Sequence, residues 1–292
     1  MFARSFRPAN ARVHYQARRR SRCGAGQIAG VKKVANVHYL EKGEGPTVVF
    51  LHGIGADSES FAFQLEAFAQ AGYHAVSWDM PGYGRSASLT PMTFPGLAKR
   101  LHQLLDELAE PAVHVIGHSI GGMIVQQLAR TAQHKFATMV LTQTSPAFGN
   151  KSGDFQRKFV SERLQPLQDG QSMAEIATQV LPSLVGKTPD PSGIQLAHKC
   201  MSRVPSEGYV AAIRCLVEFE GRDHLPLITI PTLVLAGEND SNAPASMMEK
   251  MAGKIPGAEF AVISGAGHLA PMENPDEFNY AVLDFLARRA NN

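Results

Sequence analysis

The chain has 292 residues, 44% of them hydrophobic and 18% charged, a balance typical of one globular domain with a single core. It contains no apolar run of the roughly 18 residues that a spanning helix needs, so we expect no membrane partner. The formal net charge is +2. Nine of the basic residues fall within residues 1–33, so the rest of the chain is mildly acidic. It lacks the clustered basic stripe that nucleic-acid binding requires.

Residues 1–32 form a basic leader that contains no acidic residue. Its arginine content resembles an organelle presequence, and Arg18-Arg19-Arg20 resembles a weak twin-arginine signal that no strong apolar segment follows. We expect a disordered extension outside the fold. The three cysteines show no CxxC spacing and no disulfide framework, which favours a reducing compartment; we expect a cytoplasmic protein, with targeting or export left open by the leader.

Strand and helix patterns alternate along the rest of the chain. The continuous β-branched run 47–51, which ends at two glycines, is typical of a strand buried on both faces. Such alternation predicts an α/β fold, with a mostly parallel, twisted sheet covered by helices on both faces. Strands are expected at 37–40, 47–51, 74–78, 113–116, 140–141, 232–236 and 260–263, and helices at 59–71, 94–109, 122–131 and 275–289.

Between residues 146 and 226 the strand signal disappears, and a helical pattern broken by several prolines replaces it. We interpret this segment as a helical cap inserted before the strand 232–236, over the carboxyl ends of the strands where open parallel sheets bind ligands. The core is then formed by residues 33–145 and 227–292.

The strongest chemical signal is Gly117-His118-Ser119-Ile120-Gly121, a G-x-S-x-G that follows a predicted strand and precedes a predicted helix. A sharp strand-to-helix turn strains the serine backbone and leaves no room for side chains at the flanking positions, so glycine is favoured at both. Ser119 is therefore the candidate nucleophile.

A serine hydroxyl needs a base and the base needs an orienting acid. His268 lies in a turn after the last predicted strand, and Asp240 lies in the loop after the strand 232–236, which gives the order Ser, Asp, His expected for this fold. Glu238 is the rival acid. His118, beside the serine, is an alternative substrate contact, whereas His52, His74, His102 and His114 are expected to be structural or at the surface.

Two backbone amides are the candidates for an oxyanion hole. Ile120 follows the nucleophile, and Ile54 lies in the tight turn His52-Gly53-Ile54-Gly55 after the first core strand, the two positions that stabilise the oxyanion in this kind of site.

These segments together, HGIG, WDMPGYGRS, GHSIGG, GEND and GAGHLAPMENP, resemble the α/β-hydrolase superfamily over residues 34–290. Within it the chain looks most like 3-oxoadipate enol-lactonases and related carboxylesterases. The resemblance implies a triad of Ser119, Asp240 and His268 and oxyanion amides at Ile54 and Ile120. Serine at position 119 argues against the dehalogenase and epoxide-hydrolase branches, which use aspartate there.

We therefore expect hydrolysis of a small carboxylic ester or lactone through an acyl-enzyme. No cofactor is expected, and no metal, because the sequence has no HExxH, CxxC or clustered ligand pattern. A carbon–carbon bond hydrolase of a diketone remains an alternative, as does a non-catalytic binding protein on the same fold. The expected partner is a small molecule, and a homo-oligomer is left open. A charged pocket residue for a substrate carboxylate would bear on the choice between the ester and the diketone, and the candidates are Arg85, Arg157, Arg203 and Arg214.

Overall fold

The computed structural model describes residues 32–34, 36–149 and 153–290. The predicted leader 1–32 lies outside the described residues except for Lys32, which begins the first strand. No helix in the described part of the chain is both long enough and apolar enough to cross a membrane.

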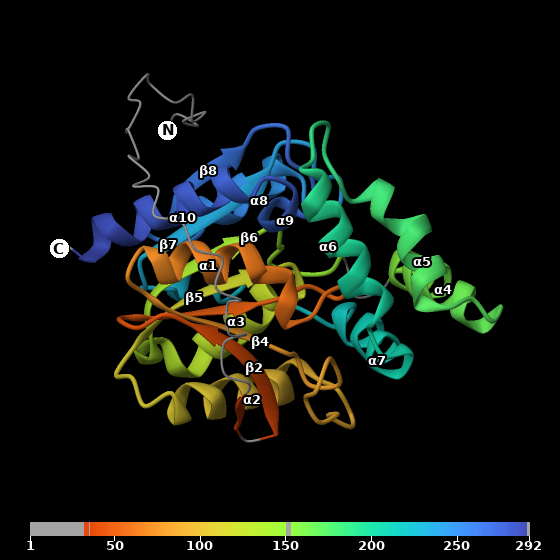
Figure 1. Cartoon of the computed structure of the whole chain (residues 1–292), viewed down its shortest axis with the longest axis horizontal. Helices are drawn as coiled ribbons and strands as arrows, with labels where there is room; N and C mark the ends of the chain where they lie inside the picture. Colours follow the sequence, from red (N-terminus) through yellow and green to blue (C-terminus); the bar gives the residue numbers. More distant parts are fainter. Residues whose placement is uncertain (1–31, 35, 150–152, 291–292) are drawn as a thin grey trace, which may run out of the picture.

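One eight-stranded sheet forms the centre of the molecule (Figure 1). Its spatial order is β1-β2-β4-β3-β5-β6-β7-β8. The six strands from β4 to β8 in this order are parallel to one another, whereas β2 pairs antiparallel with both β1 and β4. The strands are β1 (Lys32–Val34), β2 (Val37–Lys42), β3 (Thr47–Leu51), β4 (His74–Trp78), β5 (Val113–His118), β6 (Phe136–Thr142), β7 (Thr232–Gly237) and β8 (Glu259–Ile263).

Helices cover both faces of this sheet because each central strand sends successive side chains to opposite faces. In β3, Val48 and Phe50 pack in one core cluster, and Val49 and Leu51 pack in the other. The first cluster lies under α1 (Ala62–Gln70) and α10 (Pro275–Ala290), and the second under α2 (Phe94–Glu107), α3 (Ile120–Ala132) and α8 (Ala245–Ala252). Every residue of β3 is buried, as its uninterrupted apolar sequence predicts.

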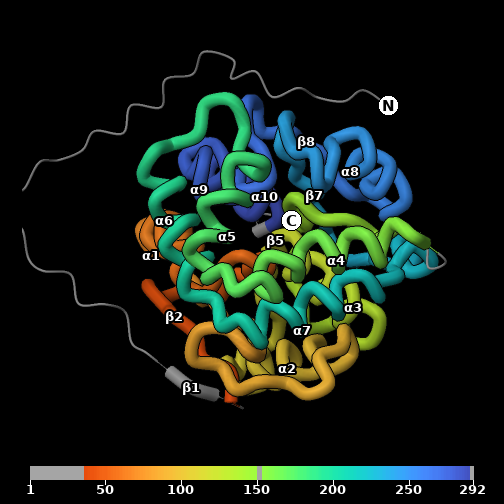
Figure 2. Tube along the Cα trace, turned by 90° about the vertical axis from the view of Figure 1, so that its right-hand side faces the viewer, coloured from red at the N-terminus to blue at the C-terminus, as the bar shows by residue number. Residues whose placement is uncertain are grey.

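Among the described residues, four α-helices lie between β6 and β7: α4 (Asp154–Gln168), α5 (Met173–Val180), α6 (Pro191–Ser202) and α7 (Ser206–Leu216). Figure 1 shows them together on the right of the molecule, and in Figure 2, where that side faces the viewer, they lie in front of the sheet. α6 contacts the short helix α9 (Ala270–Glu273) and the 3-10 turn Ser58–Phe61 of the core. The predicted class of fold is confirmed: a mostly parallel sheet, helices on both faces and helices inserted before the strand that precedes Asp240.

Candidate active site

The turn from β5 to α3 holds Ser119 in a strained backbone conformation, with φ 54° and ψ −122°, which non-glycine residues rarely adopt. Added β-carbons would lie 2.5 Å from Gly122 Cα at position 117, and 2.3 Å from the Leu51 carbonyl oxygen at position 121. The two glycines are therefore required by the close approach of the turn to β3 and to its own helix, and they project Ser119 from the end of β5.

The side chains of Ser119, His268 and Asp240 form a continuous hydrogen-bonded chain. His268 Nε2 lies 3.1 Å from Ser119 Oγ, and its Nδ1 lies 2.8 Å from Asp240 Oδ2. Because a carboxylate only accepts, Nδ1 carries the proton and Nε2 is free to accept from the hydroxyl. These three residues come from the loops after β5, β8 and β7, which the parallel sheet brings to the same edge.

Asp240 is held in its ionised form. Burial favours the neutral acid, but this is outweighed by the hydrogen bond and charge interaction with His268 and by the backbone amides of Ala243 and Asn242, so the pKa of Asp240 is lowered from its ordinary value. The side chain is buried, and both of its oxygens are used. An ionised carboxylate at this position fixes the tautomer of the imidazole and stabilises an imidazolium.

Glu238, the rival acid, lies elsewhere. It is exposed, and its Oε2 accepts hydrogen bonds from the Ser264 hydroxyl and the Gly265 amide. It therefore braces the loop after β8, while Asp240 contacts His268.

The two candidate oxyanion residues, Ile54 and Ile120, lie in the turns after β3 and β5. Ile120 is the first residue of α3, so its N–H has no partner within the helix. Ile54 lines the same pocket as Ser119. An added β-carbon at Gly53 would lie 3.2 Å from Ser119 Cβ and 3.1 Å from His118 Nδ1, which shows how closely the turn after β3 approaches the serine.

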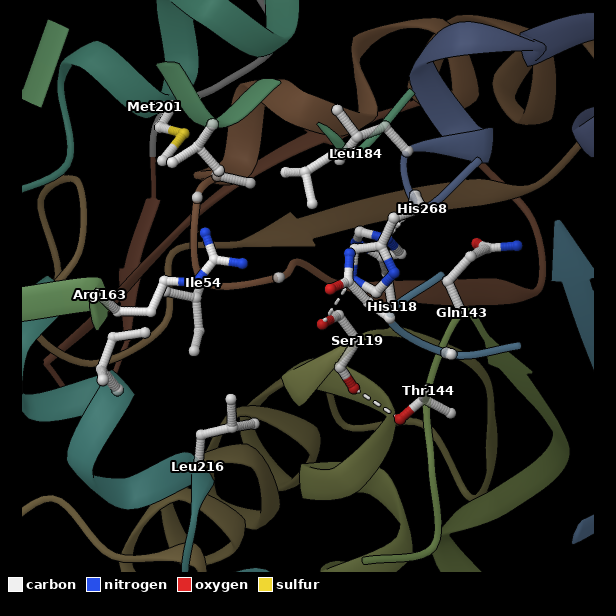
Figure 3. A pocket seen from close by; sticks show the side chains of 18 of the residues that line it. Ile54, His118, Ser119, Gln143, Thr144, Arg163, Leu184, Met201, Leu216 and His268 are labelled. Atoms are coloured by element: carbon white, nitrogen blue, oxygen red, sulfur yellow. Dashed lines mark hydrogen bonds between the residues drawn. The ribbon is translucent and has the colours of Figure 1, made fainter. Parts of the chain in front are cut away.

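His118 positions the loop of His268. Its Nε2 lies 2.7 Å from the backbone carbonyl oxygen of His268, so Nε2 carries the proton and donates it. Burial and the nearby His268 lower the pKa of His118 to about 3, and the ring is neutral at ordinary pH. His118 also lines the pocket (Figure 3), and its contact with the loop of His268 is one that the sequence did not suggest.

His52 has the structural role expected for it. Its Nε2 accepts the Met80 N–H at 2.9 Å, and its Nδ1 therefore donates to the Gly53 carbonyl at 2.8 Å. Burial lowers the pKa of this ring too. The neutral imidazole anchors the turn that carries Ile54 to the loop after β4.

Glu273 is a buried acid that sequence reasoning missed. Its Oε1 accepts the amides of Gly267 at 2.7 Å and Leu269 at 3.1 Å, on either side of His268, and its Oε2 accepts the Gly186 amide at 2.6 Å. Burial raises its pKa, although the three amides act in the opposite direction. The sequence did contain an indication of this role, because the segment GAGHLAPMENP places an acid five residues after His268.

Further backbone bonds join the loop of His268 to the segment before α6. The His268 amide donates to the Leu184 carbonyl at 2.6 Å, and the Lys187 amide donates to the Gly265 carbonyl at 2.9 Å. A β-carbon at Gly186 would lie 1.9 Å from that same Gly265 oxygen. This side of the helical insertion is therefore fixed to the loop that carries His268.

A cavity of about 390 Å³ lies between the helical insertion and the sheet, with Ser119 and His268 in its wall (Figure 3). Most of its lining is apolar, including Met123, Leu184, Met201 and Leu216. No aspartate or glutamate is among the described residues that line it. The described part of the chain also contains no cluster of three or more His, Cys, Asp or Glu able to hold a metal ion.

The four arginines proposed from the sequence as carboxylate-binding candidates do not line this cavity; Arg163 of α4 does. Arg157 pairs with Asp154, and Arg203 pairs with Asp57 and Glu59. Arg85 and Arg214 are exposed, and Arg214 lines a separate surface pocket. The positions of Arg157, Arg163, Arg203 and Arg214 depend on the helical phase within the insertion, which could not be predicted from a sequence interrupted by prolines.

Residues 46–275 match the family model described as alpha/beta hydrolase fold. The chain belongs to this family, and the resemblance expected from its motifs is confirmed. It is a hydrolase of the α/β-hydrolase fold.

Two relatives illustrate the range of reactions in this family. A protein of Stutzerimonas stutzeri (strain A1501), provisionally named a carbamate hydrolase, is 27% identical over 259 residues, covering 87% of this chain and 96% of the relative. The 2-hydroxy-6-oxononadienedioate/2-hydroxy-6-oxononatrienedioate hydrolase of a Pseudomonas species is 27% identical over 275 residues. The match covers 90% of this chain and 94% of the relative.

Solved structures agree with this fold. A thermophilic esterase from Thermogutta terrifontis in its malate-bound form is similar, with a TM-score of 0.80, 27% identity and coverage of 89% of this chain and 99% of the esterase. The enol-lactonase from Burkholderia xenovorans LB400 has a TM-score of 0.78 at 24% identity, and the match covers 88% of this chain and 100% of the enol-lactonase. This second likeness supports the fold alone.

Proposed function

We propose that the protein hydrolyses a small carboxylic ester or lactone through an acyl-enzyme, with Ser119 as nucleophile, His268 as general base and acid, and Asp240 as the residue that orients the histidine. The observation that carries this proposal is the pair of distances at His268: 3.1 Å from Nε2 to Ser119 Oγ and 2.8 Å from Nδ1 to Asp240 Oδ2. The first distance is within reach for proton transfer, and the second is that of the hydrogen bond which orients the imidazole.

In the first half of the reaction, Ser119 Oγ attacks the carbonyl carbon while its proton passes to His268 Nε2. The amides of Ile54 and Ile120 stabilise the negative oxygen of the tetrahedral intermediate. The intermediate then collapses: the bond to the leaving oxygen breaks, and that oxygen takes the proton from His268. In a lactone the leaving alcohol stays attached to the acyl group.

In the second half, His268 takes a proton from a water molecule, which attacks the acyl-enzyme, and Ser119 leaves with that proton. Asp240, ionised throughout, stabilises the imidazolium that forms in each half. This cycle balances without a redox partner or a cofactor.

We also propose that residues 146–226 act as a cap on a core of residues 33–145 and 227–292. Side chains from α4, α5, α6 and α7 line the cavity together with Ser119. Such a cap defines the shape of the pocket and excludes water from the acylated serine. The partner is a small-molecule substrate.

A carbon–carbon bond hydrolase is the second candidate, favoured by the relative from Pseudomonas described above. The experiment that separates the candidates is hydrolysis of a panel of short esters, lactones, carbamates and diketone ring-fission products by the wild type and by Ser119→Ala. We expect turnover of esters or lactones that disappears in the variant. Turnover confined to diketones would replace the esterase proposal, and serine-independent turnover would contradict both.

A further inference from the structure

The end of α6 in the helical insertion packs against the turn that carries Ile54. Met201 of α6 and Ile54 both line the cavity (Figure 3). A β-carbon added at Gly55 would lie 3.2 Å from Met201 Sδ, so glycine at this position lets the two segments approach closely. The turn of one candidate oxyanion amide is therefore in direct contact with a residue of the insertion.

Arg203, which directly follows α6, forms the polar part of this contact. Its Nη2 donates to Asp57 Oδ2 at 2.7 Å, and its Nη1 donates to Glu59 Oε1 at 2.9 Å. Lys199 of α6 donates to the other oxygen of Glu59 at 2.8 Å. Burial acts to raise the pKa of Glu59, but the hydrogen bonds from Arg203 and Lys199 outweigh it, and the pKa is lowered. Two cations of the insertion thus hold two carboxylates of the core.

Asp57 connects this ion-pair cluster to the backbone of the turn. The residue is buried, and while its Oδ2 accepts from Arg203, its Oδ1 accepts the Glu59 amide at 2.9 Å and caps the 3-10 turn Ser58–Phe61. Only two residues separate Asp57 from Ile54 in the chain. A displacement of Asp57 therefore moves the backbone segment that presents the Ile54 amide to the cavity.

The core fixes the two ends of the same turn. At one end the His52 ring bonds the Gly53 carbonyl at 2.8 Å. At the other end the Ser58 amide donates to the buried carboxylate of Asp79 at 2.8 Å. The insertion contacts the residues between these anchors, and the planar fork of Arg203 suits that task because it binds two carboxylates in one fixed geometry.

We propose that Arg203 is a positioning residue for the oxyanion hole, which acts through Asp57 to hold the Ile54 amide in place. The proposal rests on the serine-hydrolase function above. Arg203 is not among the residues that line the cavity, so its effect is indirect. Its side chain is 40% exposed, and ion pairs at such exposure add little to the free energy of unfolding. Loss of Arg203 should therefore weaken stabilisation of the transition state more than it weakens the fold.

The test compares phenyl butanoate with O-phenyl butanethioate, in which sulfur replaces the carbonyl oxygen. Sulfur is a weak hydrogen-bond acceptor, so the thiono ester gains little from the oxyanion amides, whereas nucleophile, base and leaving group are the same. Phenol release gives kcat/KM for each substrate, and the readout is the ratio of the ester value to the thiono value. A general loss of folded or active protein lowers both values and leaves this ratio unchanged.

We expect the ratio to exceed about 100 in the wild type and to fall about 10-fold in Arg203→Gln, with kcat on the ester reduced and KM nearly unchanged. Arg203→Lys keeps the charge but loses the fork, so it should retain an intermediate ratio. Asp57→Asn keeps an oxygen to cap the 3-10 turn but removes the charge that Arg203 binds. It should lower the ratio as Arg203→Gln does, and the double variant should show no further fall because the two residues act together.

Arg222→Gln is the matched control. Arg222 belongs to the insertion, has a side chain that is 42% exposed and pairs with Glu220 at 2.7 Å. Its guanidinium donates to Glu220 and to the Gly149 carbonyl, both within the insertion. The substitution therefore breaks an ion pair of similar exposure away from the turn of Ile54, and it should leave the ratio unchanged. Circular dichroism melting curves verify that each variant is folded.

Serine-dependent hydrolysis with the same ratio in the wild type and in Arg203→Gln would overturn this proposal and leave the esterase function intact. An equal fall in Arg222→Gln, or a ratio near one in the wild type, would also overturn it. If the wild type hydrolyses no ester, the esterase function fails, and the rate at which a fluorophosphonate probe labels Ser119 decides the role of Arg203, because the phosphonyl oxygen takes the place of the oxyanion. Slower labelling of Arg203→Gln than of Arg222→Gln would then support the positioning role, and equal rates would overturn it.

Discussion

The carboxylate of Glu273 lies 2.7 Å from the amide nitrogen of Gly267, the residue directly before His268. The same carboxylate reaches the Gly186 amide at 2.6 Å. One buried side chain therefore ties the loop of the candidate base to the helical insertion, and the position of His268 depends on a residue that does not touch the serine.

Replacing Glu273 with Gln should lower both stability and activity. An amide nitrogen would face a backbone N–H in place of an accepting oxygen, leaving a buried donor unsatisfied at a cost of about 1–3 kcal/mol. Urea unfolding measures the first effect, and kcat on a short ester measures the second, which should fall more than KM rises. Glu238→Gln, at an exposed acid on the neighbouring loop, is the control; equal effects of the two substitutions would contradict the positioning role of Glu273.

Asp240→Asn should reduce kcat roughly 10²- to 10⁴-fold, because an amide can stabilise the wrong tautomer of His268. Steady-state kinetics on a short ester measures this loss.

The folded-state pKa of Asp240 is lowered from 3.8. The contribution of the ionised carboxylate to the free energy of unfolding is therefore present above the unfolded pKa and is lost as pH falls through the folded pKa. The free energy of unfolding of the wild type relative to Asp240→Asn should therefore shrink below about pH 4. A difference that stays constant between pH 3 and pH 7 would be inconsistent with an ionised, hydrogen-bonded Asp240.

His118→Ala should lower kcat about 10- to 100-fold by releasing the carbonyl of His268, whereas His118→Gln, which keeps a donor, should recover part of the loss. Because the pKa of His118 is about 3, the ring does not titrate in the neutral range. The wild type and His118→Gln should therefore share the pH dependence of kcat between pH 5 and pH 9. A limb of the profile that disappears in His118→Gln would show that His118 itself titrates during turnover.

Gly121→Ala should destabilise the protein by about 1–3 kcal/mol. The β-carbon of the introduced alanine would lie 2.3 Å from the Leu51 carbonyl oxygen. Gly253→Ala is the matched control: at the end of α8 an added β-carbon would lie no closer than 3.6 Å to its neighbours. Thermal unfolding of the two variants compares them directly. A Gly121→Ala protein as stable as Gly253→Ala would show that β3 can move away from the serine turn.

The alternation of strands and helices predicted the sheet because its central strands are buried on both faces, as the uninterrupted sequence 47–51 indicates. The chain order of Ser119, Asp240 and His268 predicted which loops meet, since the carboxyl ends of parallel strands share one edge. Tight turns such as GHSIG are local, and local chemistry is visible in sequence.

Contacts that depend on how distant segments of the chain meet could not be predicted from the sequence. Glu273 is buried only because α9 turns back against the loop of His268 and against Gly186, which comes from the insertion. Arg163 and Arg157 are six residues apart on α4, or about 240° around the helix, so one faces the cavity and the other faces solvent. The sequence contains both arginines, but the phase of the helix relative to the sheet decides between them.

The most direct test of the account is covalent labelling of the intact protein by a fluorophosphonate probe, read by mass spectrometry in the wild type, Ser119→Ala and His268→Ala. The account predicts one adduct per chain on Ser119 in the wild type, none in Ser119→Ala and a strongly slowed reaction in His268→Ala. A folded wild type that is not labelled, or a Ser119→Ala protein labelled as fast as the wild type, would contradict the claim that Ser119 is an activated nucleophile.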